Sequence, residues 1–413
     1  LSFDITDKRR FPFRRYRPGN TAAPVLCITP DDSEYIHTFY DVCPFSPSGR
    51  YVAVTGLPFV NRSPKFGDIA DICIIDLREG IIKTVYRTKG WGFQLGANLN
   101  WGQSDKYLYS NDIINDQPVC VRIDIESGVI KAYSGPMYDI APDESCVIGF
   151  PLDIINKTQR GYGVPAIPGV SNNLDPGAAE NEGIWKTDLN SNKKKLLVSI
   201  ADVASKVPDP DYYRGGTFYF FHSKFNKQNT RILQVLRCLL PGGKGGRNPQ
   251  LFTFDTEGND IRQGVTREQW ARGANHPNWH PDGEHIIMNR TPTGNSMRFC
   301  QFKYDGSEFK ILSDTKLGSG HPSVEPGGRY LISDAYPEEP IALENGEVPI
   351  RFIDLESDTE EPACYIYTLG PGRGALRLDP HPAWDRDYKK VCFNGAPDGR
   401  RQVFIADLGA LMK

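Results

Sequence analysis

Four of the seven histidines in this chain occupy one repeated position. Each precedes by three residues the bulky apolar residue that begins a recurring segment, and they are His222, His276, His321 and His381. If the segments are structurally equivalent, the four imidazoles face one place. Because neutral imidazole is a common ligand of divalent metals, this register predicts a metal or catalytic centre made by the repeat itself. The alternative is that His-Pro simply begins a strand, with each ring bonded to a neighbouring backbone carbonyl.

The recurring segment spans the chain in seven copies, each with an apolar start, a turn and an apolar strand. The starts are Phe45, Trp101, Ile140, Phe225, Trp279, Val324 and Trp384. Seven further strands alternate with these and end on acidic turns, at Asp76, Asp124, Asp188, Asp255, Asp305, Asp354 and Asp407. Short strands rich in β-branched and aromatic residues, joined by Pro/Gly turns and repeating every 40 to 50 residues or so, are typical of propeller blades. The sequence therefore predicts an all-β fold, a single seven-bladed β-propeller.

The two ends of the chain predict how the ring closes. The last copy lacks a fourth strand, and the apolar run Pro24-Val-Leu-Cys-Ile-Thr-Pro30 can fill that place, which would remove exposed sheet edges. We therefore expect an N-terminal arm over residues 1–20 and a propeller over 21–413. The longest spacing between copies contains an inserted loop at 150–183, which we expect near the active-site face, since long insertions on rigid scaffolds commonly carry function.

The composition of the chain limits the kinds of molecule that the protein is expected to bind. A formal net charge of −3 argues against a general nucleic-acid binder. No apolar run approaches the roughly 18 residues of a membrane-spanning helix. We expect a monomer in a secreted or periplasmic location, and a processed chain because it begins with Leu1. Nine cysteines leave at least one unpaired, and the chain contains no Cys-x-x-Cys motif.

The whole chain resembles the seven-bladed propeller polysaccharide lyases. Oligogalacturonate lyase carries a similar run of histidines and a closing segment like Pro380-His381-Pro382. The resemblance implies a divalent metal (Zn, Mn or Ca) bound by histidines and a histidine acting as base. It implies that His276, His321 and His381 are ligands, and that His222 is the base or a fourth ligand.

The N-terminal half is also similar to propeller enzymes that act on rhamnose–glucuronate bonds: ulvan lyases, rhamnosyl-glucuronate lyases and a related rhamnosidase. The resembling stretches are 37–49, 67–71, 90–97 and 160–163. In the rhamnosidase-like enzymes a lone histidine near the first blade is proposed to hydrolyse the bond, and His37 is the matching residue of this chain. The chain has no histidine between His37 and His222, where some of these lyases would carry a catalytic pair.

Lyases of this kind cleave a 4-linked uronic acid by β-elimination, and that chemistry needs three groups. A fixed cation, either arginine or a metal, must neutralise the carboxylate so that the C5 proton becomes acidic. A base removes that proton and an acid protonates the departing O4, which are tasks for histidine or tyrosine.

Several residues are candidates for these tasks. We expect His222 or Tyr162 to be the base or acid, and Arg160 or Arg237 to bind the carboxylate. Contacts to the rest of the substrate are expected from Tyr219, Arg272 and Asn98.

The leading prediction is a lyase that cleaves a rhamnose–glucuronate linkage in a uronic-acid-containing polysaccharide or oligosaccharide and leaves an unsaturated uronate. One alternative is a glycoside hydrolase, an α-L-rhamnosidase acting through His37. The other is a non-enzymatic glycan-binding propeller, since propellers host many unrelated functions.

Overall fold

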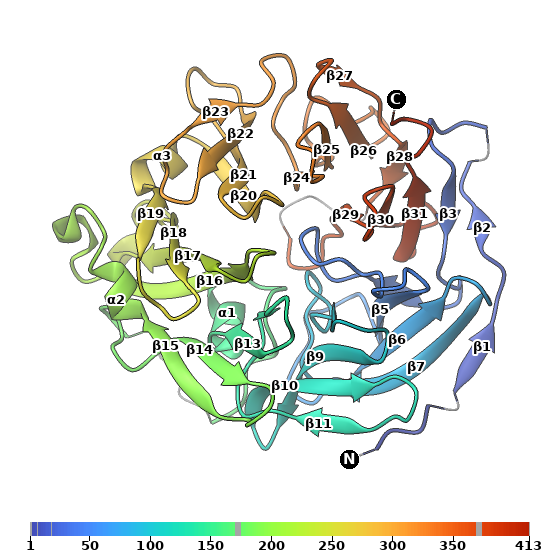
Figure 1. Cartoon of the computed structure of the whole chain (residues 1–413), viewed down its shortest axis with the longest axis horizontal. Coiled ribbons are helices and arrows are strands. Elements are labelled where there is room, and N and C mark those ends of the chain that lie inside the picture. Colours follow the sequence, from blue (N-terminus) through green and yellow to red (C-terminus); the bar gives the residue numbers. More distant parts are fainter. Residues whose placement is uncertain (1, 6, 18, 170–174, 369–373, 413) are drawn as a thin grey trace. The chain divides into compact units, whose positions relative to one another are not determined.

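The structure confirms the predicted seven-bladed β-propeller. This computed structural model describes every residue except 1, 6, 18, 170–174, 369–373 and 413. The described strands form seven antiparallel sheets of four or five strands each (Figure 1). Two compact units share them: unit 1 is Leu1–Ala132, Ile155–Pro168 and Ser319–Lys413, and unit 2 is Tyr133–Ile154 and Gly169–Gly318.

Unit 1 holds blades 1, 2, 6 and 7. In the order in which the strands are hydrogen-bonded, blade 1 is β1 (Lys8–Arg10), β7 (Ile81–Thr88), β6 (Ala70–Asp76), β5 (Tyr51–Leu57) and β4 (Glu34–Ile36). Blade 2 is β11 (Ile130–Ala132), β10 (Gln117–Asp124), β9 (Tyr107–Ile114) and β8 (Asn100–Trp101). Blade 6 is β24 (Ser323–Val324), β25 (Tyr330–Ser333), β26 (Glu347–Asp354) and β27 (Thr359–Glu360), with β28 (Cys364–Tyr367) also on β26. Blade 7 is β2 (Arg14–Arg15), β3 (Val25–Cys27), β31 (Gln402–Asp407), β30 (Lys390–Gly395) and β29 (Ala383–Trp384).

Unit 2 holds blades 3, 4 and 5. Blade 3 is β12 (Asp139–Ile140), β13 (Cys146–Gly149), β14 (Gly183–Asp188) and β15 (Lys194–Ser199). Blade 4 is β16 (Thr217–Phe225), β17 (Arg231–Leu239), β18 (Gln250–Asp255) and β19 (Arg262–Val265). Blade 5 is β20 (Ala274–Trp279), β21 (His285–Arg290), β22 (Arg298–Lys303) and β23 (Lys310–Ile311).

The helices are short and lie in connections. They are α1 (Leu152–Thr158), α2 (Ile200–Ala204), α3 (Arg267–Ala271) and the 3₁₀ turns Pro210–Tyr213 and Pro241–Gly243. Ser199 with Asp202, and Thr266 with Gln269, form capping boxes that satisfy the first amides of α2 and α3. Among the described residues, no helix combines the length and apolarity that a membrane crossing needs.

The recurring apolar residue ends the first strand of six blades, whereas Phe45 of blade 1 lies beyond β4 and forms an isolated bridge with Val52. Trp101, Trp279 and Trp384, for example, lie in β8, β20 and β29. The acidic turns are confirmed: the carboxylate of Asp76 at the end of β6 accepts from the amides of Arg78 and Glu79. Such Asx turns end the third strands because the side chain replaces the lost ladder partners.

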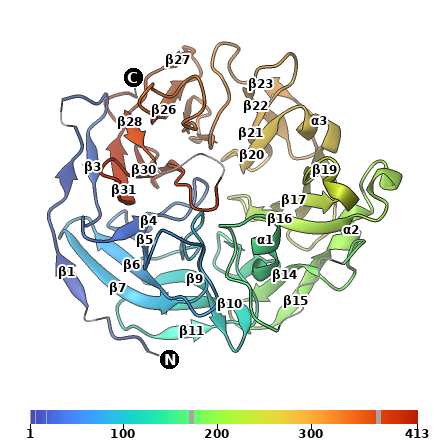
Figure 2. The ribbon, with the colours of Figure 1, turned by 180° about the vertical axis from the view of Figure 1, so that it is seen from behind.

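Closure of blade 7 by the N-terminal run is also confirmed. β3 pairs with β31 in antiparallel register, Val25 opposite Ala406, and the two strands lie side by side in both views (Figures 1 and 2). The arm is an outer layer rather than loose chain, since β1 pairs with β7 and β2 with β3. Ion pairs from Arg10 to Glu79 and from Arg17 to Glu347 hold it there.

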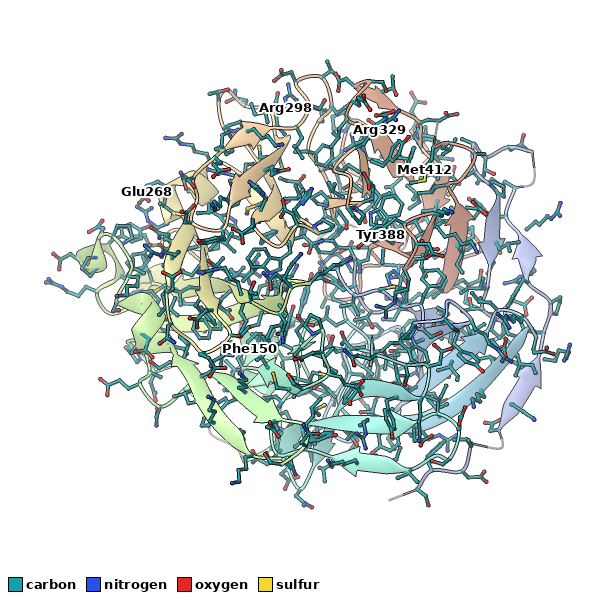
Figure 3. The ribbon with its side chains drawn as sticks, viewed as in Figure 1. Phe150, Glu268, Arg298, Arg329, Tyr388 and Met412 are labelled. Atoms are coloured by element: carbon teal, nitrogen blue, oxygen red, sulfur yellow. The ribbon has the colours of Figure 1, made fainter. Side chains whose placement is uncertain are left out.

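Apolar side chains between blades 6 and 7 form one core. Phe393 and Phe404 stack at 5.6 Å, and Tyr388 and Met412, both labelled in Figure 3, pack against the same cluster. All nine cysteines are free thiols, most of them buried as small apolar residues.

Adjacent residues of β3 give a matched test of the closure. Val25 is 3% exposed and faces the core, whereas Leu26 is 38% exposed. Val25→Asp should lower the free energy of unfolding by about 3 kcal/mol or more, because it buries an unpaired carboxylate. Leu26→Asp should change it by less than about 0.5 kcal/mol. Urea unfolding measures both, and equal effects would mean that β3 does not close the blade.

Candidate metal centre

The repeated histidine position has an unusual backbone. Residues at this position adopt positive φ angles of 49° to 62° in four blades, at Asn98, His222, His276 and His381. In blade 6 the positive φ, 59°, falls one residue earlier, on Gly320 before His321. Non-glycine residues rarely adopt this conformation, and where they do it is often at functional sites. Four blades therefore share one local backbone geometry at this position, and blade 6 differs by one residue.

In unit 2 this geometry is a β-bulge. The register of β16 with β17 shifts between Phe221 and Ser223, so His222 is the extra residue. The register of β20 with β21 shifts between Asn275 and Asn278, which places His276 in the irregular stretch. A bulge turns a side chain away from the regular face of the strand.

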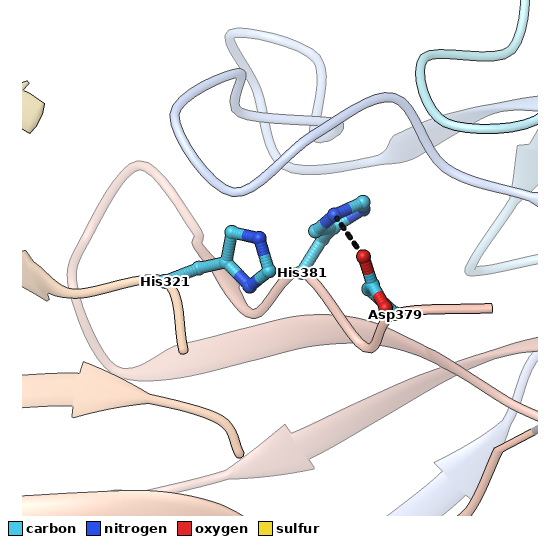
Figure 4. A group of neighbouring side chains, drawn as sticks. All are labelled: His321, Asp379 and His381. Atoms are coloured by element: carbon cyan, nitrogen blue, oxygen red, sulfur yellow. Dashed lines mark ion pairs between the residues drawn. The ribbon is translucent and has the colours of Figure 1, made fainter. Parts of the chain in front are cut away.

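In unit 1 two of the four histidines meet a carboxylate. His321, Asp379 and His381 are buried, and one possible ligand atom from each lies within 4.8 Å of the others (Figure 4). His381 Nε2 is 3.6 Å from an Asp379 oxygen, and the two imidazole centroids are 4.4 Å apart. Two imidazoles and a carboxylate form a donor set that suits Mn, Fe or Zn. We refer to these three residues as the unit 1 centre.

A second carboxylate, Asp334, holds both histidines. It follows β25 directly, and its Oδ1 accepts from the His321 backbone amide at 2.7 Å and from His321 Nδ1 at 2.9 Å. Its Oδ2 accepts from the backbone amide of His381 at 3.1 Å. A carboxylate on the far nitrogen of a ligand imidazole fixes ring orientation in many metal sites.

Arg377 borders the unit 1 centre on its other side. Its Nε donates to Asp379 at 2.8 Å and its Nη2 donates to the Tyr162 hydroxyl at 3.1 Å. Burial lowers the pKa of Arg377, but the charges of Tyr162 and Asp379 outweigh it and raise the value above the usual range. The pKa of Asp379 is itself raised by burial.

Aromatic rings pack around the histidines. Phe39 is 4.5 Å from the His381 ring and 5.8 Å from the His321 ring, centroid to centroid, and Tyr40 is 5.0 Å from the His321 ring. Tyr336 lies 6.0 Å from the His321 ring, and burial raises the pKa of its hydroxyl well above 10. These rings shield the unit 1 centre, which strengthens its electrostatic interactions.

His37 contacts the segment that carries Asp379 and His381. Its side chain is fully buried, and its Nε2 is 3.4 Å from the Pro380 carbonyl oxygen. Its backbone amide donates to Asn394, whose side chain in turn donates to the Asp379 carbonyl. Burial lowers the pKa of His37 to about 4. These contacts support a role in positioning the segment.

Two other predicted residues of unit 2, Tyr219 and Arg237, lie on the same strand pair as His222. Its Nδ1 is hydrogen-bonded to the hydroxyl of Tyr138, and its ring lies 3.9 Å from that of Phe221. The guanidinium of Arg237 lies 3.7 Å from the Phe221 ring centroid, and Arg237 is the cross-strand partner of Tyr219.

The remaining candidates do not join the unit 1 centre. Arg160 and Arg272 are exposed, and Asn98 is buried in blade 2, where its carbonyl accepts from the Asn100 side chain. His276 is partly buried in unit 2, and the adjacent Pro277 carbonyl accepts from Lys224. Arg377, rather than Arg160, is the arginine that meets Tyr162. The prediction that all four imidazoles face one place stays a prediction.

The sequence analysis missed Asp334, Asp379 and Arg377. Asp379 and Arg377 precede His381 by two and four residues, so the closing segment Arg377-Leu-Asp-Pro-His381 contained the signal. Asp334 had a register signal as well. It follows His321 by 13 residues, the same spacing that separates Asn98 from Asn111, His276 from Asn289 and His381 from Asn394.

Comparison with known proteins supports the fold. No protein-family model matches the chain. An uncharacterized protein of Agrobacterium fabrum is 27% identical over 146 residues, which are 34% of this chain and 46% of that relative. The matched region therefore spans less than half of the relative's length.

Two solved structures share the architecture along nearly the whole chain. An oligogalacturonate lyase in complex with manganese matches over 97% of both chains, with a TM-score of 0.68 and 14% identity. An oligogalacturonate lyase from Vibrio parahaemolyticus matches over 98% of this chain and 99% of its own, with a TM-score of 0.69 and 13% identity. At these identities the likeness establishes the shared propeller fold. The resemblance to ulvan lyases and rhamnosidases stays a prediction.

Removal of one donor tests the unit 1 centre directly. We expect the protein to bind one Mn²⁺, and Asp379→Asn to weaken binding by more than about 100-fold, since even outer contacts of metal ligands are worth about 10- to 100-fold. Calorimetric titration with Mn²⁺ measures the affinity. Asp354→Asn, which removes a carboxylate paired with Arg329 in the same unit, is the matched control. Equal affinities in the two variants would exclude Asp379 as a ligand.

Proposed function

We propose that this protein is a polysaccharide lyase that cleaves a 4-linked uronic acid by β-elimination and uses a divalent metal at the unit 1 centre. The buried group of two imidazoles and one carboxylate beside Arg377 carries the proposal. The shared fold with a lyase that was solved in complex with manganese supports it.

The reaction needs a fixed positive charge near a base. A proton leaves C5, the C4–O4 bond breaks, a C4–C5 double bond forms, and O4 takes up a proton. His321, Asp379 and His381 would hold a divalent ion, which would supply Lewis acidity toward the uronate carboxylate. The roles of His222 and His276 as metal ligands, and of His222 as a base, stay predictions from the sequence.

Arg377 and Tyr162 supply the remaining chemistry from the chain itself. The guanidinium of Arg377 is a fixed cation that can take one edge of the substrate carboxylate. Its hydrogen bond to the Tyr162 hydroxyl places a cation beside this phenol, which is the proposed base for the C5 proton. Arg377 therefore replaces Arg160, which lies on the same segment as Tyr162, as the residue proposed to bind the substrate carboxylate.

The proposed rhamnose–glucuronate specificity rests on the similar stretches, and two of them meet beside these residues. The amide of Gln94 donates to the Gly161 carbonyl at 2.9 Å, and the Gln94 side chain donates to the Arg377 carbonyl at 3.1 Å. A side chain at Gly92 would collide with the Gly161 carbonyl, so the close approach requires glycine. This junction supports a wall of the substrate site built from 90–97 and 160–163.

The hydrolase alternative gains no comparable support. His37 Nε2 is 3.4 Å from the Pro380 carbonyl oxygen and its backbone amide donates to Asn394, so its contacts suit a role in positioning the segment that carries His381. The location, secreted or periplasmic, and the monomeric state remain proposals.

Incubation with uronate polysaccharides tests the proposed function. With Mn²⁺ present, ulvan-type or gum-arabic-type substrates or oligogalacturonate should yield the ultraviolet absorbance of an unsaturated uronate. Arg377→Lys should lower kcat/KM by about 100-fold or more, because the two-pronged donor is lost. His285→Ala, which alters a histidine paired with Asp282 outside the unit 1 centre, should retain activity. Absence of the absorbance across the whole panel would reject the lyase, and free rhamnose without it would indicate the hydrolase.

A further inference from the structure

Blade 6 differs from its neighbours at one position of the repeat. The position 13 residues after the repeated histidine or asparagine holds Asn111, Asn289 and Asn394 in blades 2, 5 and 7, and Asp334 in blade 6. In blades 6 and 7 the pairing explains this spacing. Ser323 pairs with Ile332 and Ala383 with Cys392, so two further pairs along each ladder bring His321 opposite Asp334 and His381 opposite Asn394. Asparagine therefore holds this position in three blades, whereas blade 6 has a carboxylate there.

We propose that Asp334 is the positioning residue of the unit 1 centre. It would hold His321 in the tautomer whose Nε2 can coordinate a metal, and it would fix the backbone of His381 at the same time. The inference deepens the proposed function and rests on its metal-binding part.

The hydrogen bonds of Asp334 show why a carboxylate and an amide would act differently on the His321 ring. Three donors converge on Asp334: the backbone amides of His321 and His381 and the Nδ1 of His321. An ionised carboxylate only accepts, so Nδ1 carries the hydrogen and the lone pair of the neutral ring lies on Nε2. An asparagine has one accepting oxygen and a donating NH₂ group. Turned toward Nδ1, that NH₂ group would favour the opposite tautomer, with hydrogen on Nε2.

The backbone keeps Asp334 close to His321. Gly320 precedes His321 at positive φ, and a Cβ on this glycine would collide with both the carboxylate and the carbonyl of Asp334. The bond of the Ser333 hydroxyl to the Ser319 carbonyl, at 2.6 Å, ties the two strands together just beside this contact. Only glycine at position 320 lets the carboxylate reach the imidazole.

The same carboxylate joins two blades. His321 lies before β24 of blade 6, whereas His381 lies before β29 of blade 7, and their backbone amides donate to opposite oxygens of Asp334. Loss of the hydrogen bond to Oδ2 would release the backbone of His381. One of the three side chains that could hold the metal would then lose its fixed position. Asp334 therefore acts through both histidines and touches no substrate in this scheme.

Asp334→Asn is the decisive variant. It should fold, because three other blades place asparagine at this position. In metal-free protein labelled with ¹⁵N-histidine, the His321 signal, assigned by its loss in His321→Gln, should change from the Nδ1–H to the Nε2–H tautomer. Affinity for Mn²⁺ should fall by about 10- to 100-fold. Gly320→Ala should cause a similar loss of affinity by displacing the intact carboxylate.

The matched control is Glu339→Gln. Glu339 is a partly buried carboxylate of the same blade that accepts from Ser319 and from the Tyr336 amide but bonds neither histidine. Its removal should leave both the tautomer and the affinity for Mn²⁺ close to wild type. An unchanged tautomer in Asp334→Asn, or an equal loss of affinity in Glu339→Gln, would overturn the assignment. A tautomer change in a protein whose wild type binds no Mn²⁺ would support the role of Asp334 and reject the proposed metal chemistry.

Discussion

The arrangement of the unit 1 centre depends on cross-strand pairing at the start of each blade. The first two strands of a blade are antiparallel, so residues just before the first strand meet residues at the end of the second. In blade 6 this pairing joins His321 to Asp334, and in blade 7 it joins the His381 segment to Asn394. Because the ladders of both blades are buried and regular, neither histidine can move without breaking its strand pair. The pairing of strands in blades 6 and 7 therefore fixes the positions of His321 and His381.

Burial of charge is the second constraint. Asp334 and Asp379 are both nearly inaccessible to solvent, and Arg377 donates to only one of them. Buried carboxylates are costly unless they are paired or hydrogen-bonded. Asp334 meets this cost with three N–H donors, whereas burial raises the pKa of Asp379 in spite of Arg377. A cation bound by these three residues would offset that residual cost, so the proposed metal would also stabilise the folded protein.

The sequence predicted the blades well because their signals are local. Apolar starts, Pro/Gly turns and acidic strand ends recur at fixed spacing, and the structure confirms the strands and the closure by Val25–Cys27. The meeting of His321 with His381 also followed from the repeat. Asp379 was harder to find, because aspartate recurs along this chain as a turn residue, as at Asp76 and Asp124, and only its place two residues before His381 sets it apart.

The partner of Tyr162 could not be predicted for a different reason. Tyr162 lies on an insertion without repeat register, so its neighbours depend on how 155–168 folds back within unit 1. Glycine at 92 and 161 allows two backbones to touch there, and Gln94 then links the insertion to the Arg377 carbonyl. Arg160, two residues from Tyr162, is exposed as a consequence, while Arg377, more than 200 residues away, donates to the hydroxyl. The repeat thus sets the positions of His321 and His381. The loops that pack beside them determine that Arg377 and Tyr162 are the arginine and the tyrosine next to the unit 1 centre.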